Sequence, residues 1–306
     1  MKAKTALFCL LLGLLALSLC ACGKEASSVS IVLSGKTATV SGTGKNAVKV
    51  SDGTVLITKA GSFDISGTGE LQIVVDTNDG KAVFLNLNGM ELTCTVSSPI
   101  WIRNAAMVVF TLKEGTQNVI SDNHPYSESD AEEGNPDVPS AAIYSRAPLL
   151  LRGDGKLIVG GSSYNGISTS DTFTMEGGNL SLTAKHHGIK AKDFIVISGG
   201  YLNVKGDGDG IKTTNTEKPG LGYINITGGD ITINANDEGI YAPASISVSG
   251  GNINVKSKKT ALETDGQLSL TGGFIDIRTG DDPLAAVKWD VRPDAVITVN
   301  GRPVKY

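Results

Sequence analysis

Paired glycines that return at a constant spacing are the feature of this sequence that most restricts its fold. Gly-Gly pairs begin at positions 177, 199, 228, 250 and 272, so the step is 22 residues (199 − 177) and is lengthened once to 29 (228 − 199). The longer step predicts a seven-residue insertion (29 − 22) near EKPGLGY at 217–223. A repeat of this length predicts a stack of similar units, none of which can bury an apolar face alone.

Apolar and polar residues alternate on both sides of each glycine pair. The apolar column that follows the pair is Leu180, Leu202, Ile231, Ile253 and Ile275, and the one before it is Phe173, Ile195, Ile224, Ile246 and Leu268. Alternation with a period of two indicates strands with one buried face. Because like residues recur at like positions, each strand should lie beside its counterpart in the next unit. The predicted fold is all-β, a right-handed single-stranded parallel β-helix with coils of about 22 residues.

The overall composition agrees with this fold and excludes one class of partner. The chain has 38 glycines but only 10 prolines and 5% aromatic residues, and its abundant β-branched residues favour strands broken by turns. The formal net charge is −4 and no basic patch is present. We therefore expect no nucleic-acid partner.

The N-terminus has the pattern of a bacterial lipoprotein signal. Two lysines precede an apolar run at 6–19, which is too short for a stable transmembrane helix and ends in Leu19-Cys20-Ala21-Cys22. We predict a signal peptide at 1–22 with Cys22 lipidated, a tether at 23–30, and attachment to the extracellular face of the bacterial cell membrane through lipid alone. An ordinary secretory signal is the alternative. Cys94 is then expected to be a small buried hydrophobe.

Residues 31–306 are predicted to form one β-helical, carbohydrate-binding domain. The strand alternation before residue 141 is less regular, as in AVFLNLNGMELT at 82–93. The stretch SDNHPYSESDAEEGNPDVPS at 121–140 breaks the pattern, and it is rich in acidic residues without any Lys or Arg. We expect an acidic, solvated loop there.

Acidic residues gather at the position before a second repeated marker, Gly-Ile. Asp209 and Glu238 hold this position in consecutive units, so they should lie on adjacent coils within about 5 Å. A divalent cation would turn the repulsion between these carboxylates into attraction, and a set of oxygen ligands suits Ca²⁺ rather than Zn²⁺. The candidate ligands are Asp207, Asp209, Asn236, Asp237, Glu238, Asp281 and Asp282.

The same acidic residues have a simpler interpretation as turn formers whose charges are screened by solvent. Lys258-Lys259 take the equivalent place on the following coil and argue against a cation there. His186-His187 take it on the preceding coil, and we expect them to have a turn or surface role. The spacing alone leaves the turn and the metal site both open.

Polar residues alternate with the buried ones after each glycine pair and should form a flat outward face. Amides and hydroxyls hydrogen-bond sugars, aromatic rings pack on them, and Lys or Arg pairs with uronate carboxylates. This pattern predicts a polysaccharide-binding face, with a merely solvated exterior as the alternative. The predicted binding residues are Tyr201, Asn203, Lys205, Asn234, Asn252, Asn254, Lys256, Phe274 and Arg278.

Several segments resemble a known family. They include GSFDISGTG (61–69), EGTQNVISD (114–122), GDGDGIKTTN (206–215) and GYINITGGDITINANDEGI (222–240). In these segments the chain resembles the bacterial calcium-binding, carbohydrate-binding parallel β-helix proteins, whose described member binds cellulose and polygalacturonate. The resemblance implies a fold like that of pectate lyases, polysaccharide as the partner, and Ca²⁺ at coil turns. By motif position it carries calcium binding to Asp207, Asp209, Asp237 and Glu238, and less directly to Asp281 and Asp282.

Three functions are compatible with these features: a polysaccharide-binding module, a calcium-dependent polysaccharide lyase, and a structural surface protein. A lyase needs a base and clustered cations to stabilise an enolate. The basic candidates near the regular coils are Arg146, Arg152, Lys190 and Lys212. We expect Lys190 and Lys212 to be ion-pair partners of the turn carboxylates, and we assign no catalytic residue. The binding module is therefore the favoured function.

Overall fold

The structure, a computed structural model, describes residues 28–125 and 138–305. The signal peptide at 1–22, including Cys22, and most of the tether lie outside the described residues. The fold is all-β, with 62% of the described residues in strands. In the part of the chain that is described, the helical turn Lys45–Ala47 is of the 3₁₀ type and no α-helix is present. Strand pairing is mostly parallel and joins all the strands into one large sheet.

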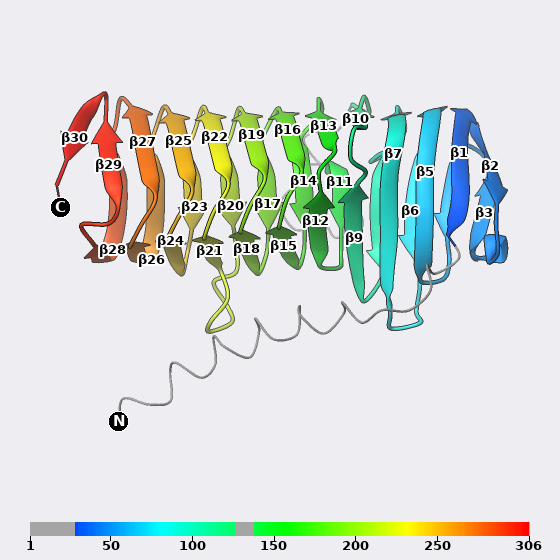
Figure 1. The fold of residues 1–306 in the computed structure, drawn as a ribbon, viewed down its shortest axis with the longest axis horizontal. Helices are drawn as coiled ribbons and strands as arrows, with labels where there is room; N and C mark the ends of the chain where they lie inside the picture. Colours follow the sequence, from blue (N-terminus) through cyan, green and yellow to red (C-terminus); the bar gives the residue numbers. More distant parts are fainter. Residues whose placement is uncertain (1–27, 126–137, 306) are drawn as a thin grey trace.

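Parallel ladders side by side make up the regular part of the molecule (Figure 1). Ladder A pairs β10 (Gln117–Asp122), β13 (Lys156–Gly161), β16 (Asn179–Ala184), β19 (Tyr201–Gly206), β22 (Asp230–Ala235), β25 (Asn252–Ser257), β27 (Phe274–Thr279) and β29 (Val296–Val299). Ladder B pairs β9 (Met107–Leu112), β12 (Leu149–Gly153), β15 (Thr172–Met175), β18 (Phe194–Ile197), β21 (Tyr223–Ile226), β24 (Ser245–Val248) and the end of β26 (Leu262–Leu270). Ladder C pairs β8 (Ile100–Asn104), β11 (Ala141–Ser145), β14 (Asn165–Thr169), β17 (Ile189–Ala191), β20 (Ile211–Thr213), β23 (Ile240–Ala242), the start of β26, and β28 (Leu284–Val291). The chain visits the ladders in the order B, A, C and then repeats.

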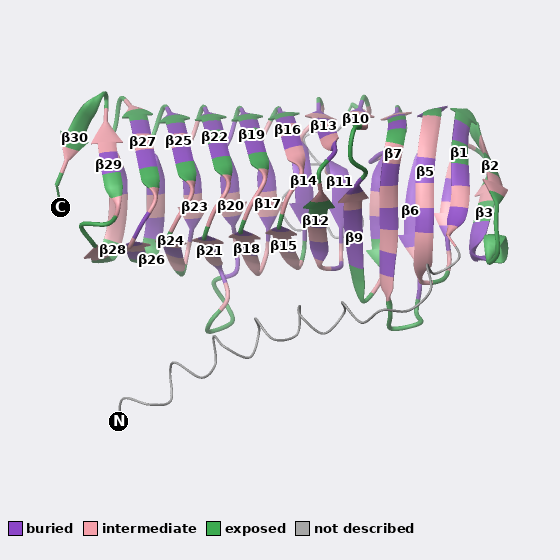
Figure 2. Cartoon of the chain, viewed as in Figure 1, coloured by how far each residue is buried: buried purple, intermediate pink, exposed green. Residues whose placement is uncertain are grey.

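The predicted apolar columns form the shared core. Leu202 pairs in register with Ile231, which pairs with Ile253, and each is at most 2% exposed. Burial alternates along the ladder A strands β19, β22 and β25, so that one face of each lies toward the interior (Figure 2). Each such side chain contributes about 1.5–3 kcal/mol on burial. Register is therefore strongly specified, since a shift by one residue would turn the whole apolar set outward.

The glycine pairs make the corner between ladders B and A. The second glycine of a pair has a left-handed backbone, with φ of 95° at Gly229 and 95° at Gly251, a conformation that is inexpensive only for glycine. Stacking adds a second reason, because a Cβ at Gly251 would lie 2.9 Å from the carbonyl oxygen of Gly229 on the preceding coil. The glycine pairs therefore recur once in each coil because each coil makes this close backbone contact with the preceding one.

The N-terminal part is built from longer and less regular strands. They are β1 (Val29–Gly35), β2 (Thr37–Ser41), β3 (Val48–Ser51), β4 (Thr54–Ile57), β5 (Gly61–Glu70), β6 (Gln72–Asp76) and β7 (Ala82–Cys94). The pairs β1–β2 and β3–β4 are antiparallel, as is β29 with β30 (Arg302–Val304) at the other end. Register shifts interrupt β5–β7 and β6–β8. Cys94 is buried, as predicted.

Two predicted boundaries need correction. β1 begins at Val29, so Val29 and Ser30 belong to the sheet and not to the tether. The acidic loop does not begin at 121, because Ser121 and Asp122 continue β10 and pair with β7 and β13. Asp122 is fully buried, and its Oδ1 accepts a hydrogen bond from the backbone N–H of His124 at 3.1 Å. Residues 126–137 of the predicted loop lie outside the described residues.

Candidate functional site

The turns from ladder A to ladder C stack as the spacing predicts. The backbone N–H of Gly210 donates to the carbonyl of Glu238 at 3.0 Å, and that of Gly239 donates to the carbonyl of Thr260 at 3.0 Å. Asp209 and Glu238 therefore sit on adjacent coils. The glycines here do not need a left-handed backbone. Glycine is required here for space, because a Cβ at Gly210 would lie only 2.3 Å from Cγ2 of the buried Ile233.

Three carboxylates meet at this turn. Oxygen atoms of Asp209, Asp237 and Glu238 all lie within 4.8 Å of one another. Asp209 is only 1% exposed, and its Oδ1 accepts a hydrogen bond from the backbone N–H of Glu238 at 3.2 Å. The structure thus brings together three of the seven predicted cation ligands. Among the described residues, this group of acidic side chains has ligand atoms close enough together to hold a metal ion.

Two lysines neutralise part of this negative charge. Lys212 Nζ lies 3.0 Å from Asp209 Oδ2, which confirms the predicted ion pair. Lys259 reaches back from the next coil, where its Nζ contacts Asp237 Oδ1 and lies 3.4 Å from Glu238 Oε1. Three carboxylates and two ammonium groups leave a net charge of −1 (−3 + 2).

The donor set fits a hard cation if Lys259 leaves the cluster. Asp209 Oδ2 and Asp237 Oδ1 are buried and, among the described residues, accept no well-directed hydrogen bond. Both lie beside ammonium groups, so they are neutralised by charge rather than by directional bonding. The Lys259 side chain is 57% exposed and can turn into solvent. Carboxylate oxygens are the ligands that Ca²⁺ prefers.

His187 lies beneath the cluster and not on the surface, which corrects the surface half of its predicted role. It is 4% exposed. Its Nδ1 accepts a hydrogen bond from the backbone N–H of Asp209 at 3.1 Å and lies 3.4 Å from Asp209 Oδ2. An Nδ1 that accepts a hydrogen bond carries no proton, so this tautomer gives no ion pair with Asp209. The imidazole therefore positions the backbone of the turn.

The remaining predicted ligands lie outside the three-carboxylate group. Asn236 Nδ2 donates to Asp207 Oδ1 at 2.8 Å, and both residues are exposed at the outer side of the turn. Asp281 and Asp282 are exposed on a later coil, where the backbone N–H of Asp281 donates to Thr279 Oγ1 at 3.1 Å. These four residues remain predictions as cation ligands.

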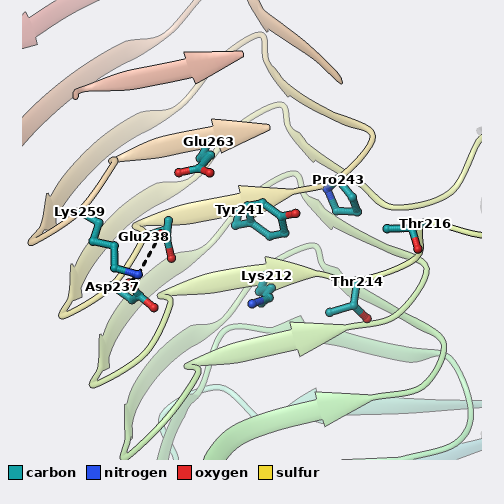
Figure 3. Close-up of a pocket in the computed structure, with 9 residues that line it drawn as sticks. All are labelled: Lys212, Thr214, Thr216, Asp237, Glu238, Tyr241, Pro243, Lys259 and Glu263. Carbon is teal, nitrogen blue, oxygen red and sulfur yellow. Dashed lines mark ion pairs between the residues drawn. The ribbon is translucent and has the colours of Figure 1, made fainter. Parts of the chain in front are cut away.

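A groove of about 460 Å³ opens beside the carboxylates on the outer side of ladder C (Figure 3). Lys212, Tyr241 and Glu263 pair in register on β20, β23 and β26 and form its floor. Asp237, Glu238 and Lys259 lie at one end, while Thr214, Thr216 and Pro243 lie at the other. The volume is in the range of small-ligand sites.

Burial and neighbouring charges shift the pKa values of Glu238 and Tyr241 in the groove. Desolvation raises the pKa of Glu238 above its usual 4.5, and the neighbouring Asp209 adds to the effect while Lys259 opposes it. Desolvation, the hydrogen bond to Asp265 and nearby carboxylates raise the pKa of Tyr241 to about 12. Tyr241 therefore stays neutral and donates its hydroxyl proton to Asp265 Oδ2 at 2.8 Å.

The predicted polysaccharide-binding face is the outer side of ladder A. Tyr201, Asp230, Asn252 and Phe274 form one cross-strand column, Asn203, Thr232, Asn254 and Asp276 a second, and Lys205, Asn234, Lys256 and Arg278 a third. Tyr201 is 60% and Phe274 44% exposed. Asn254 is half-buried, and the other predicted residues are exposed. With three cations and two carboxylates, these columns carry a net charge of +1 (3 − 2).

Sequence reasoning did not find the groove. Tyr241 and Glu263 come directly after the repeated Gly-Ile marker (Ala-Leu before Glu263), as Lys212 does, but their differing residue types hid the column. The shared offset was the available signal. From the spacing, Lys259 only argues against a metal ion on its own coil. The spacing does not show that its side chain returns to the carboxylates of the preceding coil.

Comparison with known proteins gives the family. A model of the family described as carbohydrate-binding domain-containing protein matches residues 51–301, and the chain belongs to this family. It is 36% identical over 140 residues to a carbohydrate-binding domain-containing protein of Acetivibrio thermocellus. That match covers 45% of this chain and 48% of the relative, so it spans about half of the relative's length.

The fold also matches a solved structure. A polysaccharide lyase-like protein from C. thermocellum, solved as a gadolinium derivative, superposes with a TM-score of 0.70 at 30% identity. The match covers 89% of this chain and 99% of the solved chain. The protein therefore has the fold of a polysaccharide lyase-like protein. In the described ranges, no helix has the length and apolarity to cross a membrane.

Proposed function

We propose that this protein is a polysaccharide-binding module and that the outer face of ladder A holds the glycan. The observation that carries the proposal is the register of that face, which places an exposed ring, amides and cations in parallel columns. Tyr201 and Phe274 are three strand steps apart, or roughly 14 Å, so one extended glycan can contact both rings. Family membership supports carbohydrate as the partner.

The charge of this face favours acidic glycans. Lys205, Lys256 and Arg278 form one edge of it, and Arg278 shares its charge with Asp276 Oδ2 at 3.5 Å. Lys and Arg bind carboxylates by charge-assisted hydrogen bonds. We propose polygalacturonate-type chains as ligands of this face, with cellulose as the other glycan that the sequence resemblance suggests.

The finer architecture, the cation and the cellular location belong to the same proposal. We propose a right-handed parallel β-helix with coils of about 22 residues. Ca²⁺ would be held by Asp209, Asp237 and Glu238, where it would replace Lys259 as counter-charge and stiffen two adjacent coils. Lipidation at Cys22 would hold the module at the outer face of the bacterial cell membrane.

A calcium-dependent polysaccharide lyase is the second candidate, favoured by the lyase-like structural relative. The basic candidates do not form a free base beside the carboxylates. Lys212 is engaged by Asp209, and Arg152 lies over the ring of Phe84, 5.9 Å from its centroid. A binding module is therefore the better-supported function.

One experiment separates the two functions. Purified protein is incubated with polygalacturonate and calcium, the pellet is assayed for bound protein, and the ultraviolet absorbance of unsaturated uronate is followed. We expect binding without a rise in absorbance, weakened by Lys256→Ala and unchanged by Lys113→Ala, an exposed lysine outside the face. A steady rise in absorbance would establish the lyase instead. Protein that stays in the supernatant with no rise in absorbance would refute both functions on this glycan.

A further inference from the structure

The groove of ladder C has the parts of a ligand site that is separate from the ladder A face. It lies around the corner of the coil, on β20, β23 and β26. Carboxylates of Asp237, Glu238 and Glu263 are hydrogen-bond acceptors, and the ammonium groups of Lys212 and Lys259 are donors. Thr214 and Thr216 add hydroxyls, which can donate or accept. A hydroxylated ligand can therefore find both kinds of partner within one cavity.

Tyr241 supplies a preorganised apolar surface in the middle of these groups. Its hydroxyl is anchored to Asp265 Oδ2 at 2.8 Å, and Lys212 Nζ lies 5.2 Å from its ring centroid. Its backbone is held on both sides by β20 and β26. A ring fixed in this way loses little conformational freedom when a ligand packs against it.

The charge of the groove decides which ligand it accepts. In the calcium-free protein its lining holds three carboxylates and two ammonium groups, for a net charge of −1 (−3 + 2), and Asp209 stands behind Lys212. A uronate would bring further negative charge beside these carboxylates, whereas a neutral sugar offers hydroxyls that donate to them. Carboxylates with few hydrogen bonds from the protein are good acceptors for such hydroxyls.

The geometry points to the ladder C groove as a second glycan site, specific for neutral sugars, with Tyr241 as the stacking surface. This inference rests on the proposed carbohydrate-binding function, because it assigns a second class of glycan to the same module. The molecule would then hold acidic chains on ladder A and neutral chains on ladder C. In the calcium-free protein the two sites differ in the sign of their charge, and they share no residue.

Binding of two oligosaccharides to one set of variants tests this inference. Cellohexaose is the neutral probe and hexagalacturonate the acidic one, each titrated calorimetrically with chelator present. Tyr241→Ala should weaken cellohexaose binding about tenfold or more and leave hexagalacturonate binding unchanged. Tyr223→Ala, which truncates a similarly half-exposed ring on ladder B, should change neither.

A second variant keeps the test decisive if Tyr241→Ala lowers stability. Glu263→Lys changes the charge of the groove by +2 and should weaken cellohexaose binding while adding a new binding event for hexagalacturonate. Loss of cellohexaose binding in Tyr201→Ala but not in the groove variants would overturn the inference and leave the ladder A function intact. Wild-type protein that binds hexagalacturonate but not cellohexaose would do the same. Protein that binds neither sugar would overturn the proposed function itself.

Discussion

Lys256 and Lys259 are three residues apart, yet they belong to surfaces with opposite behaviour. Lys256 extends from β25 into solvent on the ladder A face, whereas Lys259 turns back to the carboxylates of Asp237 and Glu238 on the preceding coil. The face therefore presents its cations to a partner, and the groove uses its cations internally. Stacking explains the difference, because superposed turn carboxylates need counter-charges that superposed asparagines and threonines do not.

The largest expected effect is on the face. Lys256→Glu combined with Arg278→Glu reverses the charge of its edge, and like charges at an interface cost several kcal/mol. Hexagalacturonate affinity should fall about 100-fold. Titration calorimetry measures the change, and Lys113→Glu combined with Lys259→Glu is the matched double reversal outside the face. An equal loss in both variants would show that net charge, and not the face, controls binding.

The next effect concerns stability and should appear only at the turn. Asp209→Ala removes the buried partner of Lys212 and the acceptor of the Glu238 N–H, which should cost about 2 kcal/mol of unfolding free energy. Asp207→Ala, two residues away but exposed, should stay within about 0.5 kcal/mol. Urea unfolding measures both. Equal losses would mean that the carboxylates do not differ in structural role.

A smaller effect is expected on calcium. Lys259→Met removes the ammonium group that competes for Asp237 and Glu238, so calcium affinity should rise about tenfold. Lys258→Met is the control, since its lysine neighbours the same turn but makes no recorded ion pair with these carboxylates. Chelator should lower the melting temperature of wild-type protein. Absence of calcium heat in every variant would remove the cation from the proposal.

The smallest effect is a pH dependence. Because desolvation raises the pKa of Glu238 above 4.5 in the folded protein, the ionised form is unfavourable there. Below the unfolded pKa the carboxyl is protonated in both states and costs nothing, and stability is then lost as the pH rises through the folded pKa. Glu238→Gln should lack this loss and melt slightly higher near neutral pH. Glu263→Gln in the same groove provides the comparison, and an identical profile for both variants would argue against the burial effect.

The repeat was predictable because its physics is local and periodic. Leu202, Ile231 and Ile253 recur at one offset from the glycines, and parallel pairing in register is the arrangement that buries them together. The stacking of Asp209 on Glu238 follows from the same register. The columns of the ladder A face were predictable for the same reason.

The groove was not predictable, because it depends on side-chain direction across coils. Nothing in the spacing tells that Lys259 bends toward the preceding turn or that Tyr241 is fixed by Asp265. The burial of His187 was not predictable for a similar reason, since its partner is the backbone N–H of Asp209 on the next coil. The acidic composition of 121–140 predicts a loop that includes Asp122, and it gives no sign that β10 continues through this residue.

The insertion between β20 and β21 shows where this architecture tolerates editing. Residues 216–221 leave the stack and return to it, and they project from one edge of the molecule (Figure 1). Lys212 and Ile224 on either side still pair with their neighbours above and below. We expect that a foreign peptide inserted here would be displayed by a rigid scaffold whose strand pairing stays unchanged.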